Sequence, residues 1–237
     1  MNISVCIATY NGQQFIKDQI SSVLKQLSTN DEIIISDDDS NDSTLKVIES
    51  FNDRRIKIFK NNKPKGYTNN FINAIEKSSN ELIFLCDQDD VWMNNKVDIC
   101  RKYISEGYHM VISNAEVVDQ DLNILSDSYF STRNTKFGFF NNLIRVGYLG
   151  CTLAFNKSIL KGLYPFPENK KLIPHDLWIG MYSMLFYKVK WTNIPLIKYR
   201  RHSSNVSDGG FEVSKLSLIN KFKLRFILIL NLIYRKR

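Results

Sequence analysis

Two clusters of carboxylates carry the clearest chemical signal in this sequence. Asp37, Asp38 and Asp39 lie within residues 36–43, and Asp87, Asp89 and Asp90 lie within residues 86–92. Capping of a following helix accounts for one or two of these acids, but adjacent carboxylates repel one another unless donors or a ligand offset their charge. The Asp-x-Asp spacing in the second cluster offers hard oxygen ligands for Mg²⁺ or Mn²⁺, which proteins commonly share with substrate phosphates. A carboxylate of the first cluster suits the ring N–H of uracil or thymine. We therefore predict a metal-bound phosphate ester beside a polar recognition pocket.

Asp176 and His202 are the next candidates. Between residues 128 and 207 only Glu168 and Asp176 are acidic, against twelve Lys and Arg residues. Asp176 begins a predicted helix, and its position has two explanations. The helix dipole alone would favour an acid there, or Asp176 is a general base that removes a proton from a hydroxyl. His202 could complete a metal site or be an ordinary polar surface residue, and Arg200 or Arg201 could bind a diphosphate through two hydrogen bonds.

Other kinds of site are not supported. The segment Thr9-Tyr10-Asn11-Gly12 could hold a ligand or be a simple turn. The chain contains neither G-x-G-x-x-G nor G-x-x-x-x-G-K-[ST], so dinucleotide and P-loop sites are excluded. Its four cysteines form no C-x-x-C pair, which argues against a zinc ribbon and against a redox motif. Two of the cysteines lie in apolar runs, where they would be buried as free thiols, and this suits a reducing cytoplasm. We expect no secretion signal and no bilayer-spanning segment, since no run of about 18–20 apolar residues occurs.

The elements that must position these groups alternate along the first hundred residues. Short apolar runs predict strands at residues 3–8, 32–36, 56–59, 82–86 and 110–113, with helical periodicity between them at residues 15–27, 45–51 and 71–75. Such alternation predicts βαβ units, a mainly parallel sheet flanked by helices, and function at the carboxyl ends of the strands. Both carboxylate clusters follow strands directly, so we expect them to converge on one crevice.

The second half of the sequence is less regular. We predict a hairpin at 116–125, a short helix at 137–145, a strand at 151–155 and a helix at 176–186. Two further strands are predicted at 188–194 and 196–199, separated by Pro195. This organisation indicates one catalytic domain, residues 1–212, and an appendage, residues 213–237.

The formal net charge of +8 is concentrated in that appendage. Residues 1–212 carry 25 Lys and Arg against all 24 acids, whereas residues 213–237 carry seven basic residues and no acid. The nearly neutral body argues against nucleic acid as a partner. The basic, apolar tail predicts an amphipathic helix that either packs on the domain or lies on an anionic membrane surface.

The ordered set of motifs resembles family 2 glycosyltransferases with the GT-A fold. The resemblance covers roughly residues 1–207 and rests on Ala8-Thr9-Tyr10-Asn11, Asp37-Asp38-x-Ser40, Lys65-Gly66, Asn70-Phe71, Asp87-Gln88-Asp89-Asp90-x-Trp92, Gly150-Cys151, His175-Asp176 and Tyr199-Arg200-x-His202. The Asp-Gln-Asp-Asp-Val-Trp and His-Asp-Leu-Trp segments are most similar to bacterial rhamnosyltransferase-type members of cell-surface polysaccharide synthesis.

The resemblance implies a role for each matched residue. Asp176 is the catalytic base, and Asp89 and His202 are the metal-site residues for Mn²⁺ or Mg²⁺. The nucleotide-binding residues are Thr9, Tyr10, Asn11, Asp38, Gly66, Asn70 and Asp87, with Asp38 facing the pyrimidine. His175 stands where many relatives carry Glu, so its role is left open.

The resemblance also implies the reaction and its partners. We expect an inverting transfer from a nucleoside-diphosphate sugar, dTDP-rhamnose or a UDP-sugar, to a hydroxyl of a lipid-linked glycan. The expected location is cytoplasmic, at the inner face of the plasma membrane. Two alternatives stay open on the residues alone: a sugar-phosphate nucleotidyltransferase, which would carry a Gly- and Arg-rich loop after the first strand, and a non-enzymatic nucleic-acid-binding module.

Overall fold

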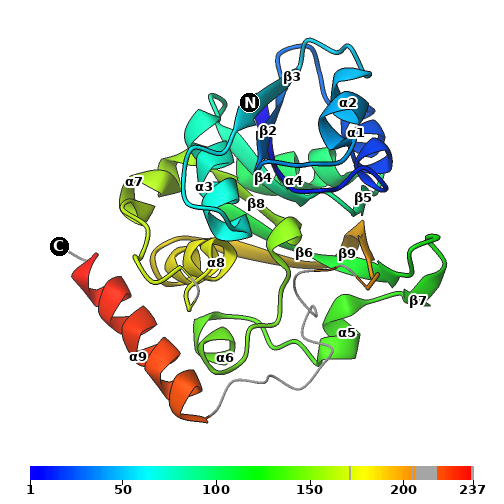
Figure 1. Ribbon diagram of the computed structural model, residues 1–237. Helices are drawn as coiled ribbons and strands as arrows, with labels where there is room; N and C mark the ends of the chain where they lie inside the picture. The colour runs from blue at the N-terminus through cyan, green and yellow to red at the C-terminus, as the bar shows by residue number, and fades with distance from the viewer. Residues whose placement is uncertain (171, 204, 206–217, 236–237) are drawn as a thin grey trace.

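A single mixed sheet organises the computed structural model, which describes residues 1–170, 172–203, 205 and 218–235 (Figure 1). Within these residues the sheet has nine strands in the order β3-β2-β1-β4-β8-β6-β9-β5, with β7 paired to β6. The strands are β1 (Ile3–Thr9), β2 (Glu32–Asp37), β3 (Ile56–Lys60), β4 (Leu82–Asp87), β5 (Val91–Trp92), β6 (Met110–Val118), β7 (Ile124–Ser126), β8 (Leu153–Asn156) and β9 (Val189–Arg200).

The N-terminal half of the sheet is parallel, as the sequence predicted. β1 pairs in parallel with both β2 and β4, and β2 pairs in parallel with β3. The register sets Thr9 opposite Asp37, and Ala8 opposite Asp87. Because these strands end level with one another, the two carboxylate clusters emerge at the same edge.

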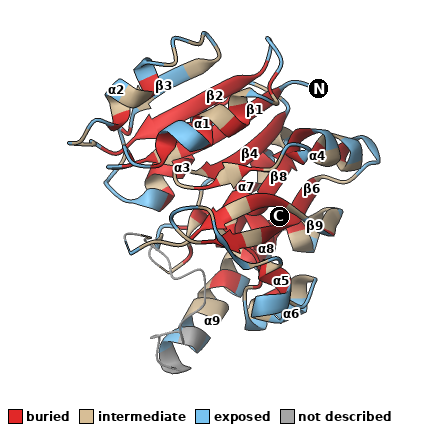
Figure 2. Ribbon diagram, turned by 90° about the vertical axis from the view of Figure 1, so that its right-hand side faces the viewer, coloured by how far each residue is buried: buried red, intermediate tan, exposed pale blue. Residues whose placement is uncertain are grey.

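Helices cover this half because their apolar positions recur at helical spacing. They are α1 (Ile16–Leu24), α2 (Thr44–Glu49), α3 (Tyr67–Lys77) and α4 (Lys96–Ser105). Ile16, Ile20 and Val23 of α1 are fully buried. Figure 2 shows the resulting layers, with buried strands inside and exposed residues on the outer helices. The predicted arrangement of helices around a mainly parallel sheet is confirmed.

The second half departs from the prediction at two strands. The strand predicted at 151–155 begins only at Leu153, since Gly150–Thr152 forms a 3-10 turn, and β8 lies antiparallel between β4 and β6. The two strands predicted on either side of Pro195 are one strand, β9, so that prediction was wrong. Pro195 pairs with Asn114 where the register shifts, which is how a proline without an N–H is tolerated within a sheet. The predicted hairpin is confirmed by the antiparallel pairing of β6 and β7.

The remaining described helices follow α4 in the chain. They are α5 (Tyr129–Arg133), α6 (Phe139–Ile144), α7 (Leu160–Leu163), which follows a 3-10 turn at Lys157–Ile159, α8 (His175–Phe186) and α9 (Leu218–Tyr234). Leu228 and Leu232 of α9 are buried against the domain. None of the described helices is long and apolar enough to cross a membrane. The part of the predicted tail before Leu218 lies outside the described residues.

Candidate active site

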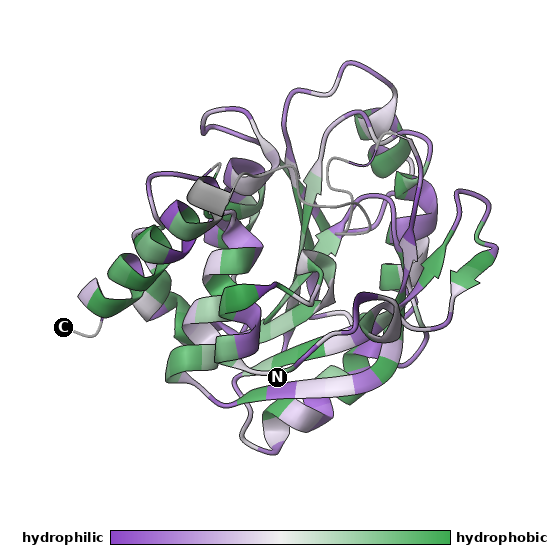
Figure 3. Ribbon diagram, turned by 90° about the horizontal axis from the view of Figure 1, so that it is seen from below, coloured by the Kyte–Doolittle hydropathy of each residue, from purple (hydrophilic) through white to green (hydrophobic). Residues whose placement is uncertain are grey.

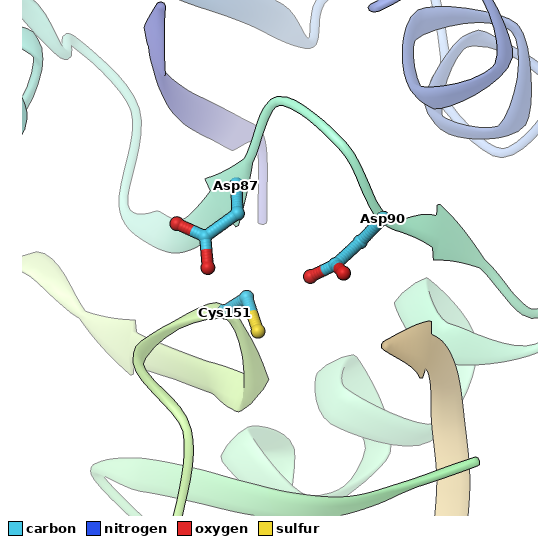
Figure 4. Close-up of side chains that lie close together, drawn as sticks. All are labelled: Asp87, Asp90 and Cys151. Carbon is cyan, nitrogen blue, oxygen red and sulfur yellow. The ribbon is translucent and has the colours of Figure 1, made fainter. Parts of the chain in front are cut away.

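Asp87, Asp90 and Cys151 form a compact group at the carboxyl end of β4. One ligand atom from each lies within 4.8 Å of the others, and Figure 4 shows the three side chains close together beside the end of the strand. Burial raises the pKa of Asp87 to about 7, and the Asp89 and Asp176 carboxylates add to the effect. Burial also raises the pKa of Asp90 well above its usual range, with Asp89 and Asp87 contributing. The carboxylates of this group therefore disfavour one another's charge, and the buried Lys96 ammonium, which donates to the Cys151 carbonyl at 3.2 Å, lies beside them.

Asp89 turns from this group toward the residues after β9. Its Oδ2 lies 2.9 Å from Nε2 of His202 and accepts a hydrogen bond from Nδ2 of Asn205 at 3.1 Å. The backbone N–H of His202 donates to Oδ1 of Asn205 at 2.7 Å, and the imidazole packs 4.5 Å from the Phe15 ring. The structure thus brings together Asp89 and His202, the two predicted metal-site residues, and adds Asn205 to them.

These residues fit a divalent cation. Oδ2 of Asp90 is buried without a hydrogen-bond partner, although Oδ1 accepts from the Arg200 N–H at 3.0 Å. Carboxylate oxygens are the preferred ligands of Mg²⁺ and Mn²⁺, and imidazole is a common ligand of transition metals. A cluster of mutually repelling carboxylates with an unpartnered buried oxygen is what such an ion would stabilise.

Asp176 lies at the first turn of α8 and faces the same group, as its effect on the pKa of Asp87 indicates. Its Oδ1 is buried without a hydrogen-bond partner. The Tyr148 hydroxyl donates to the backbone oxygen of Asp176 at 3.3 Å, and a Cβ placed on Gly150 would lie 3.0 Å from Asp176 Cβ. The carboxylate is therefore held by close packing, with an oxygen left to accept a proton.

His175, whose role the sequence left open, is a packing residue. Its ring is buried and stacks on Phe71 with centroids 4.2 Å apart. Burial lowers the pKa of His175 to about 4, against an opposing effect of Asp176. At neutral pH the imidazole is uncharged and anchors the start of α8 against α3.

Asp38, the residue predicted to recognise the pyrimidine, follows β2 and is hydrogen-bonded to the segment that leads into α3. Its Oδ1 accepts from Nδ2 of Asn61, and its Oδ2 accepts from the Gly66 N–H, both at 2.8 Å. Gly66 adopts φ +133°, a conformation that favours glycine. Nδ2 of Asn70 donates to the Thr9 carbonyl at 3.0 Å, while Oδ1 of Asn70 is buried without a partner. Asp38 thus shapes the pocket, and Asn70 leaves it an unused acceptor.

Thr9, Tyr10 and Asn11, the residues predicted to bind the nucleotide at the first turn, differ in burial and in hydrogen bonding. Thr9 is buried and its hydroxyl donates to Oδ1 of Asp37 at 2.8 Å, so it supports the turn. Oδ1 of Asn11 accepts from the Asn41 N–H at 2.8 Å, whereas the side chain of Tyr10 is half exposed at the edge. The Gln88 amide fixes the backbone of Tyr10 through hydrogen bonds of 2.9 and 3.0 Å.

The two arginines after β9 have different environments. Arg200 is buried: its guanidinium donates to Oδ2 of Asp18 at 3.1 Å and to the Gln120 carbonyl at 3.0 Å, and packs on Phe15. The Arg200 side chain therefore secures β9 against α1. The Arg201 side chain is hydrogen-bonded to that of Tyr199.

Sequence reasoning assigned no role to three residues at this edge, Asn205, Gln88 and Cys151. Gln88 and Cys151 lie within the motifs that carry the family resemblance, and Asn205 follows the last of these motifs. Cys151 lies in the 3-10 turn Gly150–Thr152, and its carbonyl accepts from the fully buried Lys96 ammonium at 3.2 Å, an arrangement that depends on contacts across the fold.

Comparison with known proteins identifies the family of this chain. The family model described as glycosyl transferase family 2 matches residues 4–164. The chain belongs to glycosyltransferase family 2. The family match favours glycosyl transfer over the two alternative functions left open by the residues.

Two curated relatives match most of this family 2 chain. It is 27% identical over 223 residues to the Escherichia coli UDP-Glc:alpha-D-GlcNAc-diphosphoundecaprenol beta-1,3-glucosyltransferase WfgD, covering 90% of this chain and 82% of the relative. It is also 27% identical to the Shigella flexneri dTDP-rhamnosyl transferase RfbG, covering 97% and 81% of the two chains. The predicted similarity to rhamnosyltransferases is confirmed.

The fold matches solved glycosyltransferases. Residues 1–349 of TarS from S. aureus, in complex with UDP-GlcNAc, superpose with a TM-score of 0.75 at 18% identity, covering 98% of this chain and 66% of TarS. The chain spans just under two thirds of that structure's length. This likeness and the family match confirm the predicted GT-A fold.

Proposed function

We propose that this family 2 glycosyltransferase moves a sugar from a UDP- or dTDP-sugar to a hydroxyl of a lipid-linked glycan, with inversion at the anomeric carbon. One observation carries the proposal: Asp176, which has a buried oxygen without a hydrogen-bond partner, lies close enough to Asp87 to raise the pKa of that carboxyl. The names of WfgD and RfbG, which include a diphosphoundecaprenol acceptor and a dTDP-rhamnosyl activity, support these donor and acceptor classes.

Asp176 is the proposed general base. Its Oδ1 accepts the proton of the acceptor hydroxyl as that oxygen forms a bond to the anomeric carbon. The bond between the anomeric carbon and the diphosphate oxygen breaks on the opposite face, and the electron pair leaves with the nucleoside diphosphate. Gly150 and Tyr148 hold Asp176 in place for this transfer.

The leaving diphosphate requires positive charge. We assign Asp89 and His202, whose polar atoms lie 2.9 Å apart, and Asp87 as the residues that would hold Mn²⁺ or Mg²⁺; Asp87 also belongs to the group with Asp90 and Cys151. Such an ion supplies charge that stabilises the departing diphosphate. Arg201 is the residue from this chain that we assign to the same phosphates.

The pocket between Asp38 and Asn70 is the proposed site for the pyrimidine. The unpartnered Oδ1 of Asn70 offers an acceptor for a ring N–H, and Gly66 leaves open space, since a Cβ there would meet no atom within 4 Å. Thr9, Tyr10 and Asn11 form the rim of that pocket. A membrane-bound acceptor further implies that the enzyme works at the cytoplasmic face of the plasma membrane, as a peripheral protein.

The test is a product assay with a panel of UDP- and dTDP-sugars and an undecaprenyl-diphosphate-linked sugar acceptor. We expect release of nucleoside diphosphate and an inverted anomeric configuration by NMR. Release of pyrophosphate would instead identify a nucleotidyltransferase.

Two variants assign the roles. Asp176→Asn should abolish transfer while leaving nucleotide affinity nearly unchanged, whereas Asp89→Ala should lose the part of that affinity that depends on Mn²⁺. Normal turnover by Asp176→Asn, or an Mn²⁺ response retained by Asp89→Ala, would contradict the assignments.

A further inference from the structure

An exposed apolar surface spans two helices that are far apart in the sequence. On α6, Phe140 and Ile144 are 78% and 72% exposed, and on α9, Phe222 and Phe226 are 73% and 63% exposed. The Arg225 guanidinium on α9 donates to the carbonyl of Ile144 on α6, which joins the two helices. Figures 1 and 2 both show α6 and α9 side by side at one end of the molecule.

The exposed residues of α9 lie on one stripe. Phe222, Phe226, Ile229 and Ile233 recur at steps of four, three and four residues, which places them on one face of a helix. Leu228 and Leu232 lie on a different face and are buried against the domain. Figure 3 shows hydrophobic colour along most of α9. The helix therefore has two apolar faces, of which only one is used within the domain.

The described charged residues on and beside α6 and α9 are basic. Lys136 and Arg145 flank α6 and are exposed, and Lys223 is exposed on α9. Glu168 is the sole acid between residues 128 and 175, and residues 213–237 contain none. Apolar side chains bordered by lysine and arginine are the pattern that binds anionic lipid at the level of the headgroups.

We propose that α6 and the outer stripe of α9 form one docking surface for an anionic lipid bilayer. This proposal rests on the proposed function, because a lipid-linked acceptor is presented at such a bilayer. It assigns membrane contact to α6 as well as to the tail, with Phe140, Ile144, Phe222 and Phe226 entering the headgroup region.

The surface is placed to deliver the acceptor. Only five residues separate Ile144 from Gly150, which packs against Asp176. An extended chain covers at most about 3.5 Å per residue, so α6 lies within ~20 Å of the proposed base. A bilayer against α6 would therefore bring a diphosphate-linked sugar near Asp176.

Vesicle co-sedimentation tests the proposal with the full chain. The probes are vesicles of phosphatidylcholine alone and with phosphatidylglycerol. The variants are Phe140→Ser/Ile144→Ser on α6 and Phe222→Ser/Phe226→Ser on α9, and the matched control is Ile124→Ser/Leu125→Ser, which removes exposed apolar residues of β7 (55% and 60% exposed).

We expect the wild type to prefer anionic vesicles, each of the α6 and α9 variants to lose about tenfold or more in partitioning, and the control to match the wild type. Hydrolysis of the donor sugar in the absence of acceptor should be unchanged in all variants, which separates this proposal from the proposed function. If the α6 variant binds anionic vesicles like the wild type, the two-helix surface is wrong. If the variants instead convert a dimer to a monomer in sedimentation velocity, with vesicle binding unchanged, the occupant is a second copy of this chain and the proposal is overturned.

Discussion

Gly150→Ala tests the positioning of the catalytic base more sharply than removal of the base itself. The added Cβ would lie 3.0 Å from Asp176 Cβ and 3.2 Å from Oδ2. Carbon atoms in contact are optimally about 3.5–4.0 Å apart, so the Asp176 side chain must move by roughly 0.5–1 Å. Since a misplacement of about 1 Å can cost on the order of 10²-fold in rate, we expect kcat to fall ~10- to 100-fold.

The same change should leave the fold intact. Gly150 is not among the glycines with positive φ, so alanine is compatible with the backbone there. A compatible Gly→Ala change alters the free energy of unfolding by less than about 1 kcal/mol, in the stabilising direction when contacts can adjust. The prediction is thus a loss of kcat with stability and donor affinity preserved.

The assay compares single-turnover transfer, donor binding by calorimetry and urea unfolding for Gly150→Ala and a neighbouring control. Gly147→Ala is the control, since its Cβ would meet Thr135 at 2.8 Å rather than Asp176. It should lower stability with little effect on kcat. Wild-type kcat in Gly150→Ala, or parallel loss of stability and activity in both variants, would refute the role of Gly150 and weaken the assignment of Asp176.

Three further predictions concern neighbouring groups. Burial lowers the pKa of His175 from 6.5 to about 4, so below pH 6.5 the unfolded chain takes up a proton that the folded chain does not. The wild type should therefore lose stability between pH 7 and pH 4, and His175→Phe should remove up to ~3 kcal/mol of that loss, measured by urea unfolding. Identical pH profiles of stability for the two proteins would contradict this. Asp38→Ala leaves the Gly66 N–H and Asn61 amide without an acceptor, and should cost ~1–3 kcal/mol and raise the donor KM, with Asp38→Asn losing less. Arg200→Met should lower the melting temperature and leave the donor KM unchanged, because Arg200 secures β9 against α1. Arg201→Met should raise the donor KM and leave the melting temperature unchanged. A raised donor KM in Arg200→Met would instead place Arg200 at the diphosphate.

The parallel half of the fold could be read from the sequence because local signals and tertiary structure agree there. The run at residues 3–8 is apolar at nearly every position, as a strand buried on both faces must be, and it ends where polar residues begin. Register then follows, and with it the convergence of Asp37 and Asp87 at one edge. The second half was less predictable because β9 continues through Pro195 by shifting its pairing with Asn114, a tertiary accommodation that residue preferences do not reveal.

The roles of individual site residues were harder to predict than their location. Thr9 and Asp38 were predicted as nucleotide ligands, and in the structure their polar atoms also bind Asp37, Asn61 and Gly66. Residue type shows that a side chain can form hydrogen bonds but not which atoms it meets. Motif order therefore located the site, while the division between ligand contact and support of the turns required coordinates.

Three buried polar atoms at the sheet edge have no hydrogen-bond partner and are therefore candidates for ligand contact. Asn70 Oδ1, Asp90 Oδ2 and Asp176 Oδ1 are buried without partners, and they come from α3, the β4–β5 turn and α8. Each such atom costs about 1–3 kcal/mol unless something binds it, and more when it is charged. A fold selected for stability alone would pair them, as it pairs the oxygens of Asp38. Among the buried unpartnered atoms of the described chain, these three are ones that a base N–H, a cation and an acceptor hydroxyl would satisfy in the working complex, so the interactions that weaken the empty enzyme would provide its binding energy.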